Sequence, residues 1–407
     1  MRLLIKRYIS TILFVSFFSI LLAGCAIFKK EPIARKDTAL IRVASSEYPQ
    51  FQDDMEYDGL GHSIRQSISY LKKVPANMKF RFGEETFDAV HMISSLEHFL
   101  DFITTEPSGQ NLKKYIDSNY IVYSSIGGDN FGQVLFTGYY EPFLEGCLEK
   151  SDQCRFPIYS RPDDLMIIDL SLFSRRFKGE KIIGRYSNKT MVPYYDRSEI
   201  ECGGALDGKM KPIAWLKDRV DLFFLQIQGS GKIHLDNGRI INVHYYGTNG
   251  RPYRSIGKLL IDEGKIPRSE MSMQKIRSYL HEHPEEIETV LSYNTSYVFF
   301  KVEKDGPLGS LEVKLTPGRS IALDRRLFPP AGLAFIETQK PVINGNGEID
   351  HWVKFKRFVL HHDTGGAIRG PGRADLFFGN GPYAEVVAGH MQHAGRLYFL
   401  ILNPNIS

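Results

Sequence analysis

The sequence predicts a mainly β protein whose strands form a barrel, with helices near the N-terminus. Aromatic residues make up 12% of the 407 residues and occur with 36 Gly and 20 Pro, a composition that favours short strands joined by turns. The last third of the chain consists of short apolar runs separated by Gly and Pro. Because that third lacks the helices needed to connect parallel strands, a barrel is favoured over a doubly wound sheet.

The overall composition excludes several classes of protein. Hydrophobic residues (43%) and charged residues (24%) are close to globular averages, which excludes disordered, collagen-like and multi-span membrane chains. The formal charge is +4, but Arg2, Lys6 and Arg7 lie in the first 24 residues, which contain no acid; without them, 48 basic and 47 acidic residues remain. Bulk charge therefore gives no support to a nucleic-acid partner.

The first 24 residues have the pattern of a secretory signal. A basic segment at 1–7 precedes an apolar run at 8–23, and residues 22–25 read Leu-Ala-Gly-Cys. The run is shorter than the roughly 20 residues of a membrane-spanning helix, so a permanent anchor helix is the weaker alternative. The tetrapeptide resembles a bacterial lipobox, which implies that Cys25 is the lipid-bearing first residue of the mature chain. By the same resemblance, Ala26 in place of Asp implies the outer membrane, facing the periplasm.

Helical patterns dominate the region before residue 130. Residues 25–57 are polar without a clear period, as expected of a tether. Apolar residues then recur every three or four positions over 59–71 and 86–103, which predicts two amphipathic helices, and a third is expected over 108–118. The alternating segment 132–140 predicts a strand.

The middle region, 146–305, alternates between strand and helix patterns, whereas the chain beyond Pro307 is expected to be nearly pure β. Expected strands in the middle region lie at 182–185, 221–228 and 240–246, and expected helices at 256–263 and 269–282. In the last third, strands are expected at 311–315, 331–337, 357–362, 389–391 and 397–402.

Three cysteines remain after the lipobox. Cys147 and Cys154 are seven residues apart in a loop-like stretch, and an oxidising compartment would allow a disulfide between them, with Cys202 left over. The alternative is that they remain free thiols. A zinc site is disfavoured, because thiolate pairs at tighter spacing with His partners are missing from the sequence.

The segment 358–381 is the densest candidate for chemistry. An apolar strand leads into Asp363, a Gly-rich turn follows, and Asp375 begins a second apolar run. Paired acids suit glycoside cleavage, because one protonates the leaving oxygen while the other acts as base or nucleophile. The alternative is that both aspartates only accept backbone N–H bonds in tight turns. His361 and His362 are adjacent on a strand and point to opposite faces, so they cannot chelate one ion together; one of them is expected to be buried or at an edge.

Two other segments carry side chains suited to an uncharged polar ligand. The strand end at 136–142 combines tyrosines and a carboxylate that fit a sugar, although such residues also fill barrels. Gln226 and Gln228 are expected on one face of a strand, where their amides would donate to and accept from a glycan; a solvent-facing edge is the alternative. The Gly229-Ser-Gly231 spacing differs from that of an esterase nucleophile turn.

Taken in order, these segments resemble the membrane-bound lytic murein transglycosylase A family of bacterial cell-wall enzymes. The similarity spans about 130–402 and is carried, besides the lipobox, by the motifs at 136–142, 192–201, 221–231, 250–253 and 296–300. The closing segment resembles the three-aspartate domain of that family through Asp324, Asp363 and Asp375.

The resemblance implies a fold and a set of site residues. The fold would be a double-psi β-barrel formed by 58–145 and 306–405, including the N-terminal helices, with a second, mostly β domain inserted at 146–305. Asp375 aligns with the catalytic acid of the family, Asp363 would support it, and Asp324 would be structural. The glycan would lie in a groove between the two domains, bound by Thr137, Tyr139, Tyr140, Glu141, Gln226, Gln228, Ser230 and Tyr253.

The resemblance also implies the reaction and its partners. The family cleaves the β-1,4 bond between N-acetylmuramic acid and N-acetylglucosamine without water, leaving a 1,6-anhydro ring, with no metal or cofactor. The implied partners are peptidoglycan glycan strands and the membrane, and proteins of cell-wall synthesis and division are further candidates. Two alternatives are a hydrolase that uses Asp363 and Asp375 to activate water and a non-catalytic lipoprotein that binds peptidoglycan.

Overall fold

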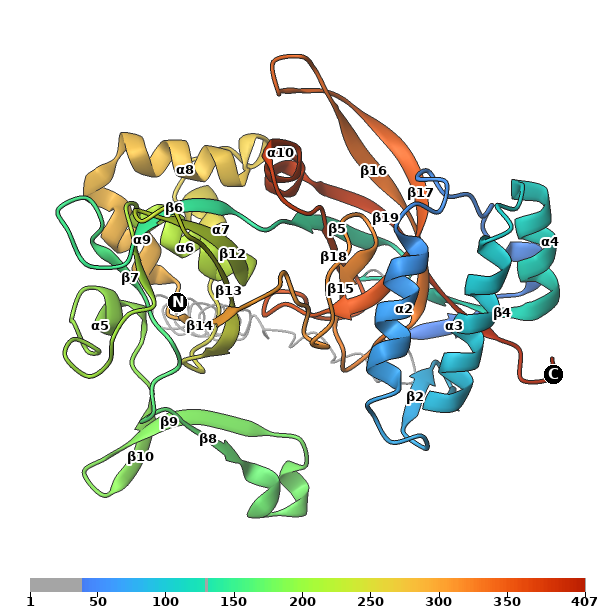
Figure 1. Ribbon diagram of the computed structural model, residues 1–407, viewed down its shortest axis with the longest axis horizontal. Coiled ribbons are helices and arrows are strands. Elements are labelled where there is room, and N and C mark those ends of the chain that lie inside the picture. Colours follow the sequence, from blue (N-terminus) through green and yellow to red (C-terminus); the bar gives the residue numbers. More distant parts are fainter. Residues whose placement is uncertain (1–38, 129–130, 407) are drawn as a thin grey trace, which may run out of the picture. The chain divides into compact units, whose positions relative to one another are not determined.

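The computed structural model describes residues 39–128 and 131–406 (Figure 1). The predicted signal, Cys25 and the first part of the predicted tether lie outside the described residues. Among the described residues, no helix combines the length and the apolar character needed to cross a membrane.

Six strands of the largest sheet close into a barrel. The sheet order is β1-β4-β19-β16-β17-β15-β18-β5, and β5 also pairs with β19, which closes the ring from β19 to β5. Within the ring, β15 pairs with β17 and β18 pairs with β5 in parallel, and the other pairs are antiparallel. The strands are β1 (Leu40–Arg42), β4 (Tyr120–Ser125), β5 (Val134–Tyr139), β15 (Ser320–Ala322), β16 (Leu333–Ile343), β17 (Ile349–Asp363), β18 (Arg373–Phe377) and β19 (Gln392–Leu402).

Three helices precede β4 and confirm the predicted helical region. They are α2 (Leu60–Leu71), α3 (Ala89–Ile103) and α4 (Gly109–Asn119). Asp88 begins α3 by accepting a hydrogen bond from the His91 N–H at 3.0 Å, a cap that satisfies a free helix donor. The three residues before this helix belong instead to β3 (Glu85–Asp88), which pairs with β2 (Lys79–Phe82). In the fold α2 packs on β17 and α3 on β19, so the helices cover part of the barrel.

The second half of the predicted tether is part of the fold. Residues 40–42 form β1, which pairs with β4, and Phe51 is buried with its ring centroid 4.9 Å from that of Phe335. Asp53 is buried and accepts hydrogen bonds from the Arg319 guanidinium at 2.6 and 2.7 Å. The sequence hides this packing, because a three-residue strand and single buried side chains produce no period.

A second sheet, with order β14-β13-β12-β6-β11-β7, forms the middle of the chain. Its strands are β6 (Phe143–Cys147), β7 (Phe156–Ile158), β11 (Ala214–Leu216), β12 (Ser230–Leu235), β13 (Ile240–Thr248) and β14 (Val298–Glu303). Five helices accompany it: α5 (Arg197–Glu201), α6 (Arg219–Gln228), α7 (Ile256–Asp262), α8 (Met273–Glu282) and α9 (Ile287–Tyr293). A separate three-stranded sheet contains β8 (Met166–Asp169), β9 (Lys181–Ser187) and β10 (Thr190–Pro193).

The prediction of a strand at 221–228 is wrong, because this segment belongs to α6. Asp218 caps the helix by accepting from two backbone N–H groups, and Gly229, at φ 80°, ends it in a left-handed conformation. Leu222 packs in one hydrophobic cluster and Phe223 in another, so the helix is buried on two sides. A helix buried in this way has a continuous apolar run, which resembles that of a buried strand.

Part of the last third also differs from the prediction of nearly pure β structure. The expected strand at 389–391 falls largely in α10 (Pro382–His390), which begins with a proline that suits the first turn of a helix. Residues 311–315 form a loop with a single bridge between Leu308 and Lys314. The other three expected strands are present and are longer than predicted, as β16, β17 and β19.

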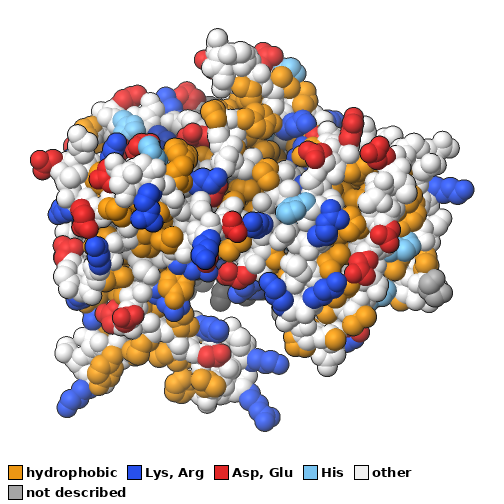
Figure 2. All heavy atoms as spheres, viewed as in Figure 1, with side chains coloured by type: hydrophobic (Ala, Val, Ile, Leu, Met, Phe, Trp, Pro, Cys, Tyr) orange, Lys and Arg blue, Asp and Glu red, His pale blue; other side chains and the backbone are white. Residues whose placement is uncertain are grey.

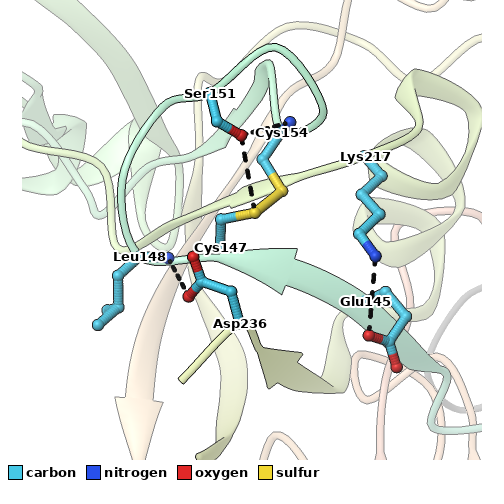
Figure 3. Close-up of a disulfide and its surroundings, with 7 residues drawn as sticks. All are labelled: Glu145, Cys147, Leu148, Ser151, Cys154, Lys217 and Asp236. Carbon is cyan, nitrogen blue, oxygen red and sulfur yellow. Dashed lines mark hydrogen bonds and ion pairs between the residues drawn. A yellow bond between two sulfur atoms is a disulfide. The ribbon is translucent and has the colours of Figure 1, made fainter. Parts of the chain in front are cut away.

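A disulfide links Cys147 and Cys154, which decides between the two states that the sequence left open (Figure 3). The loop between them is also held by hydrogen bonds: Ser151 Oγ accepts from the Cys154 N–H at 3.1 Å, and the Leu148 N–H donates to Asp236 at 3.3 Å. The bridge therefore fixes a loop at the end of β6, while Cys202 is free and exposed.

Candidate functional site

The candidate acids lie on one face of the barrel wall, in register with each other. Asp363 on β17 pairs with Ala322 on β15, Ala322 pairs with Asp375 on β18, and Asp375 pairs with Thr137 on β5. Paired residues on neighbouring strands point to the same side of a sheet. The four side chains therefore form one row across four strands.

A β-bulge places Asp363 in this row. Ile321 pairs with His361, but the next residue of β15, Ala322, pairs with Asp363 and not with His362. The extra residue turns Asp363 to the face that carries Asp375, and such bulges often redirect side chains next to active sites.

His361 and His362 are both buried, whereas only one was expected to be buried or at an edge. His361 Nδ1 lies 3.0 Å from the Pro329 carbonyl oxygen, and the two ring nitrogens of His362 each lie 2.9 Å from a serine hydroxyl, those of Ser67 and Ser320. Burial lowers the pKa of His361 to about 4 and that of His362 to about 3. Both rings are therefore neutral packing groups near pH 7, and they bind different partners.

Asp375 is held through one side-chain contact. Its Oδ1 accepts a hydrogen bond from the Thr137 hydroxyl at 2.8 Å. Burial raises the pKa of the carboxyl to about 6; the Thr137 hydroxyl and the charge of Arg373 oppose this shift, and the nearby Asp363 adds to it. A carboxyl with this pKa can donate a proton near neutral pH and then accept one.

Asp363 is held more tightly. Its Oδ1 accepts from the backbone N–H groups of Ser310 (2.9 Å) and Thr364 (2.8 Å), and its Oδ2 accepts from the Tyr139 hydroxyl (3.0 Å). Burial raises its pKa to about 6 against these donors, which stabilise the ionised form. The alternative that the aspartates accept backbone N–H bonds therefore applies in part to Asp363, which accepts two of them. The hydrogen bond to Asp375 comes instead from a side-chain hydroxyl.

The hydrogen-bond partners of Asp324 differ from those of Asp363 and Asp375. It is fully buried, accepts from the Arg326 guanidinium at 2.8 and 2.6 Å, and accepts from the Gly370 N–H at 3.0 Å. Burial alone would raise the pKa of Asp324, but the hydrogen bonds from Arg326 and Gly370 outweigh it and lower the pKa. Asp324 is therefore an ionised group that connects the end of β15 to the loop before β18.

The other predicted ligand-binding residues of the strand end lie where β5 meets the middle region. Tyr140 and Glu141 are buried, at 3% and 1% exposure. The Tyr140 N–H donates to Gln228 Oε1 at 3.0 Å, so this glutamine supports the backbone of the strand end. Glu141 forms an ion pair with Lys232 on β12 at 3.3 Å and accepts from Asn380 Nδ2 at 3.2 Å.

The remaining predicted binding residues lie in a helix (Gln226), a strand (Ser230) and a loop (Tyr253). Gln226 is buried within α6, and it is not on one face with Gln228, because residues two apart on a helix point in different directions. Ser230 begins β12, where it is buried and pairs with His244 on the neighbouring strand β13. Tyr253 lies in the loop between β13 and α7 and is 41% exposed, which leaves part of its ring open to a ligand.

Sequence reasoning missed two groups that act on the acids. Arg373 lies two residues before Asp375 on the same strand, so the alternation of β18 could have revealed it. The Ser310 N–H comes from a loop far away in the sequence. A signal for this loop is Gly309, where a Cβ would lie 2.4 Å from the His362 carbonyl oxygen, so only glycine allows the loop to approach β17.

Comparisons with known proteins agree with this architecture. Two family models match the chain: the MltA specific insert domain over residues 135–301 and the 3D domain over residues 319–401. The membrane-bound lytic murein transglycosylase A of Escherichia coli strain K12 is 34% identical over 281 residues, which cover 68% of each chain.

Solved structures of this kind also align over most of the chain. The crystal structure of a membrane-bound lytic murein transglycosylase from Agrobacterium tumefaciens aligns with a TM-score of 0.72 and 30% identity, over 89% of this chain and 98% of that one. E. coli MltA with bound chitohexaose aligns with a TM-score of 0.65 and 27% identity, over 84% of this chain and 90% of that one.

Proposed function

The chain belongs to the membrane-bound lytic murein transglycosylase A family, and we propose that it cleaves the β-1,4 bond between N-acetylmuramic acid and N-acetylglucosamine of peptidoglycan without water, forming a 1,6-anhydro ring. The observation that carries the proposal is the Asp375 carboxyl, partly buried in the barrel wall with a pKa raised to about 6. The relative solved with bound chitohexaose supports a glycan as the substrate.

In the first step, Asp375 acts as the acid. Its protonated carboxyl donates to the oxygen that links the two sugars, and the bond from C1 of N-acetylmuramic acid to that oxygen breaks. The raised pKa of Asp375 supports this role, since a carboxyl at its ordinary pKa would be almost fully ionised at neutral pH.

In the second step, the same carboxylate acts as the base. It takes the proton of the C6 hydroxyl of the muramic acid as the C6 oxygen bonds to C1, which closes the anhydro ring and returns Asp375 to its protonated form. Because the attacking oxygen belongs to the substrate, its effective concentration is high, and a second carboxylate that positions water is unnecessary.

Asp363 and Thr137 would then adjust the pKa and the orientation of the Asp375 carboxyl. Asp363 is held by three donors, which leaves it less free to exchange protons, and its charge helps to raise the pKa of Asp375. Thr137 orients the Asp375 carboxyl through Oδ1 and leaves Oδ2 for the substrate.

The glycan groove is proposed along the junction between the barrel and the middle region. Tyr253 would stack on a sugar ring, since its side chain is partly open. Tyr139 would line the groove beside the acids, and the buried residues Tyr140, Glu141, Gln226, Gln228 and Ser230 would shape its walls.

The type of barrel, the domain bounds, the lipid anchor and the cellular location are part of the same proposal. Two parallel strand pairs within a six-stranded ring support a double-psi barrel, made of 58–145 and 306–405 with 146–305 inserted. The lipobox supports a lipid anchor at Cys25 and a periplasmic position on the outer membrane, with cell-wall synthesis and division proteins as further partners.

Asp375→Asn tests the assignment of the acid. The amide keeps the size of the side chain and its acceptor for Thr137 but cannot donate a proton as an acid, so release of soluble fragments from purified murein should fall at least about a hundredfold. Binding to murein should persist, and Asp363→Asn should be impaired less. Asp350→Asn, an exposed site on the β16–β17 hairpin, is the matched control. Turnover near that of the wild type in Asp375→Asn would remove the acid from this position.

A further inference from the structure

The sheet β8–β9–β10, residues 166–193, carries apolar side chains outside any core. We call it the arm; Figure 1 shows it as a ribbon that extends beyond the body of the middle region. Hydrophobic side chains are visible along it in Figure 2. Six of them are well exposed: Met166, Ile167, Leu172, Phe173, Ile182 and Tyr186. Met166, Ile182 and Tyr186 share one face of the sheet, because Ile182 pairs with Ile168 and side chains two apart on a strand point the same way. Exposed apolar side chains gathered on one element in this way often mark a binding face.

The tip of the arm holds its two most exposed residues in a defined loop. Leu172 is 84% exposed and Phe173 is 74% exposed. Two 3-10 turns, Leu170–Leu172 and Arg175–Phe177, form the loop, and Asp169 accepts from the Ser171 N–H at 2.9 Å to cap the first. Backbone and polar side-chain hydrogen bonds therefore hold the loop, and packing of Leu172 and Phe173 is not needed for its shape.

Positive charge surrounds the same tip. Between residues 166 and 192 the chain has six basic and two acidic residues, an excess of four that equals the formal charge of the whole chain. Three of the basic residues, Arg175, Arg176 and Lys178, follow Phe173 within five positions and are exposed. Without Arg2, Lys6 and Arg7 of the predicted signal, the part of the chain outside the arm has 42 basic and 45 acidic residues, so the arm is positive while the remainder is slightly negative.

The base of the arm is firmly attached. Tyr194, just after β10, and Leu165, just before β8, are buried in one hydrophobic cluster, and the Tyr194 hydroxyl donates to Asp164 at 2.6 Å. The exposed surface is thus displayed by an anchored element and does not result from fraying of the sheet.

We propose that the arm tip docks on an anionic phospholipid surface. Exposed aliphatic and aromatic side chains flanked by Arg and Lys are the chemistry of interfacial membrane binding: the apolar groups enter the headgroup boundary, and the cations meet acidic lipids. The charge excess distinguishes a lipid surface from a neutral partner. This contact is additional to the proposed anchor at Cys25 and does not depend on it.

Vesicle binding of the acyl-free chain that starts at Ala26 tests this proposal, since the described residues belong to one compact unit. The chain should bind vesicles of phosphatidylethanolamine with phosphatidylglycerol, bind phosphatidylcholine vesicles much less, and dissociate as salt is raised. Leu172→Ser with Phe173→Ser should lower the partition coefficient at least about tenfold, and Arg175→Gln with Arg176→Gln should remove the preference for acidic lipid.

Ile41→Ser with Val90→Ser provides the matched control, because these residues have comparable exposure outside the arm and should bind vesicles like the wild type. Turnover of soluble murein fragments should be unchanged in the Leu172 and Phe173 variant, which separates failure of this proposal from failure of the proposed reaction. Equal vesicle binding by that variant would overturn the proposal. A dimer in sedimentation that the variant abolishes would also overturn it, by assigning the surface to a second copy of the chain.

Discussion

The two acids of the barrel wall differ in how they are held, although burial raises the pKa of each to about 6. Asp363 has three hydrogen-bond donors and Asp375 has the Thr137 hydroxyl, so the proton on Asp375 is the easier one to exchange. The charge of Asp363 also raises the pKa of Asp375. The proposed mechanism therefore assigns the role of acid to Asp375 and that of adjusting its pKa to Asp363.

The pH dependence of kcat/KM on murein fragments follows from this difference. An acid that must begin protonated is active below its pKa, so the rate should fall as pH rises above about 6. Asp363→Asn removes a charge that raises the pKa of Asp375 and should move the falling limb to lower pH. Thr137→Val removes a donor that lowers this pKa and should move the limb to higher pH.

These two variants act as controls for each other, because their shifts have opposite signs. A falling limb at the same pH in both variants would show that another group supplies the proton.

At the scale of elements, the fold depends on a buried ion pair between the N-terminal segment and the barrel. Asp53 accepts from Arg319 and from the Phe358 N–H, so one carboxylate joins residues 51–58 to β17 and to the turn before β15. The Arg319 side chain is fully buried, and loss of its partner would leave a charge without compensation.

Asp53→Ala should therefore lower the free energy of unfolding by about 3–5 kcal/mol, measured by urea denaturation. Glu85→Ala breaks the exposed ion pair with Arg42 and should cost less than about 1 kcal/mol. Equal effects of the two substitutions would contradict a structural role for the buried pair.

Elements with one apolar face were predictable from the sequence, and those with unusual burial were not. The helices α2 and α3 have a buried stripe and a polar face, so their period is clear. In contrast, α6 is buried on two sides and reads as a strand. The bulge at His362 is a single extra residue whose existence depends on the pairing with β15, so no local pattern reveals it.

At the scale of the whole molecule, a β-barrel and the two aspartates were predictable, while the order of strands was not. The turn-rich apolar runs indicate many short strands, and the family resemblance identifies Asp363 and Asp375 as candidate site residues. The row that joins them passes through Ala322 and Thr137, which come from strands far apart in the chain. Side chains from such strands meet only after the ring has closed, so their contacts could not be read from local sequence.

In the proposed reaction the C6 hydroxyl of the substrate, and not water, attacks C1. Digestion of purified murein in water enriched in oxygen-18, followed by mass spectrometry of the soluble products, distinguishes the two nucleophiles. The products should be one water lighter than reducing muropeptides and should lack the heavy oxygen, and Asp375→Asn should not release them. Reducing products that carry oxygen-18 would contradict it and would identify a hydrolase.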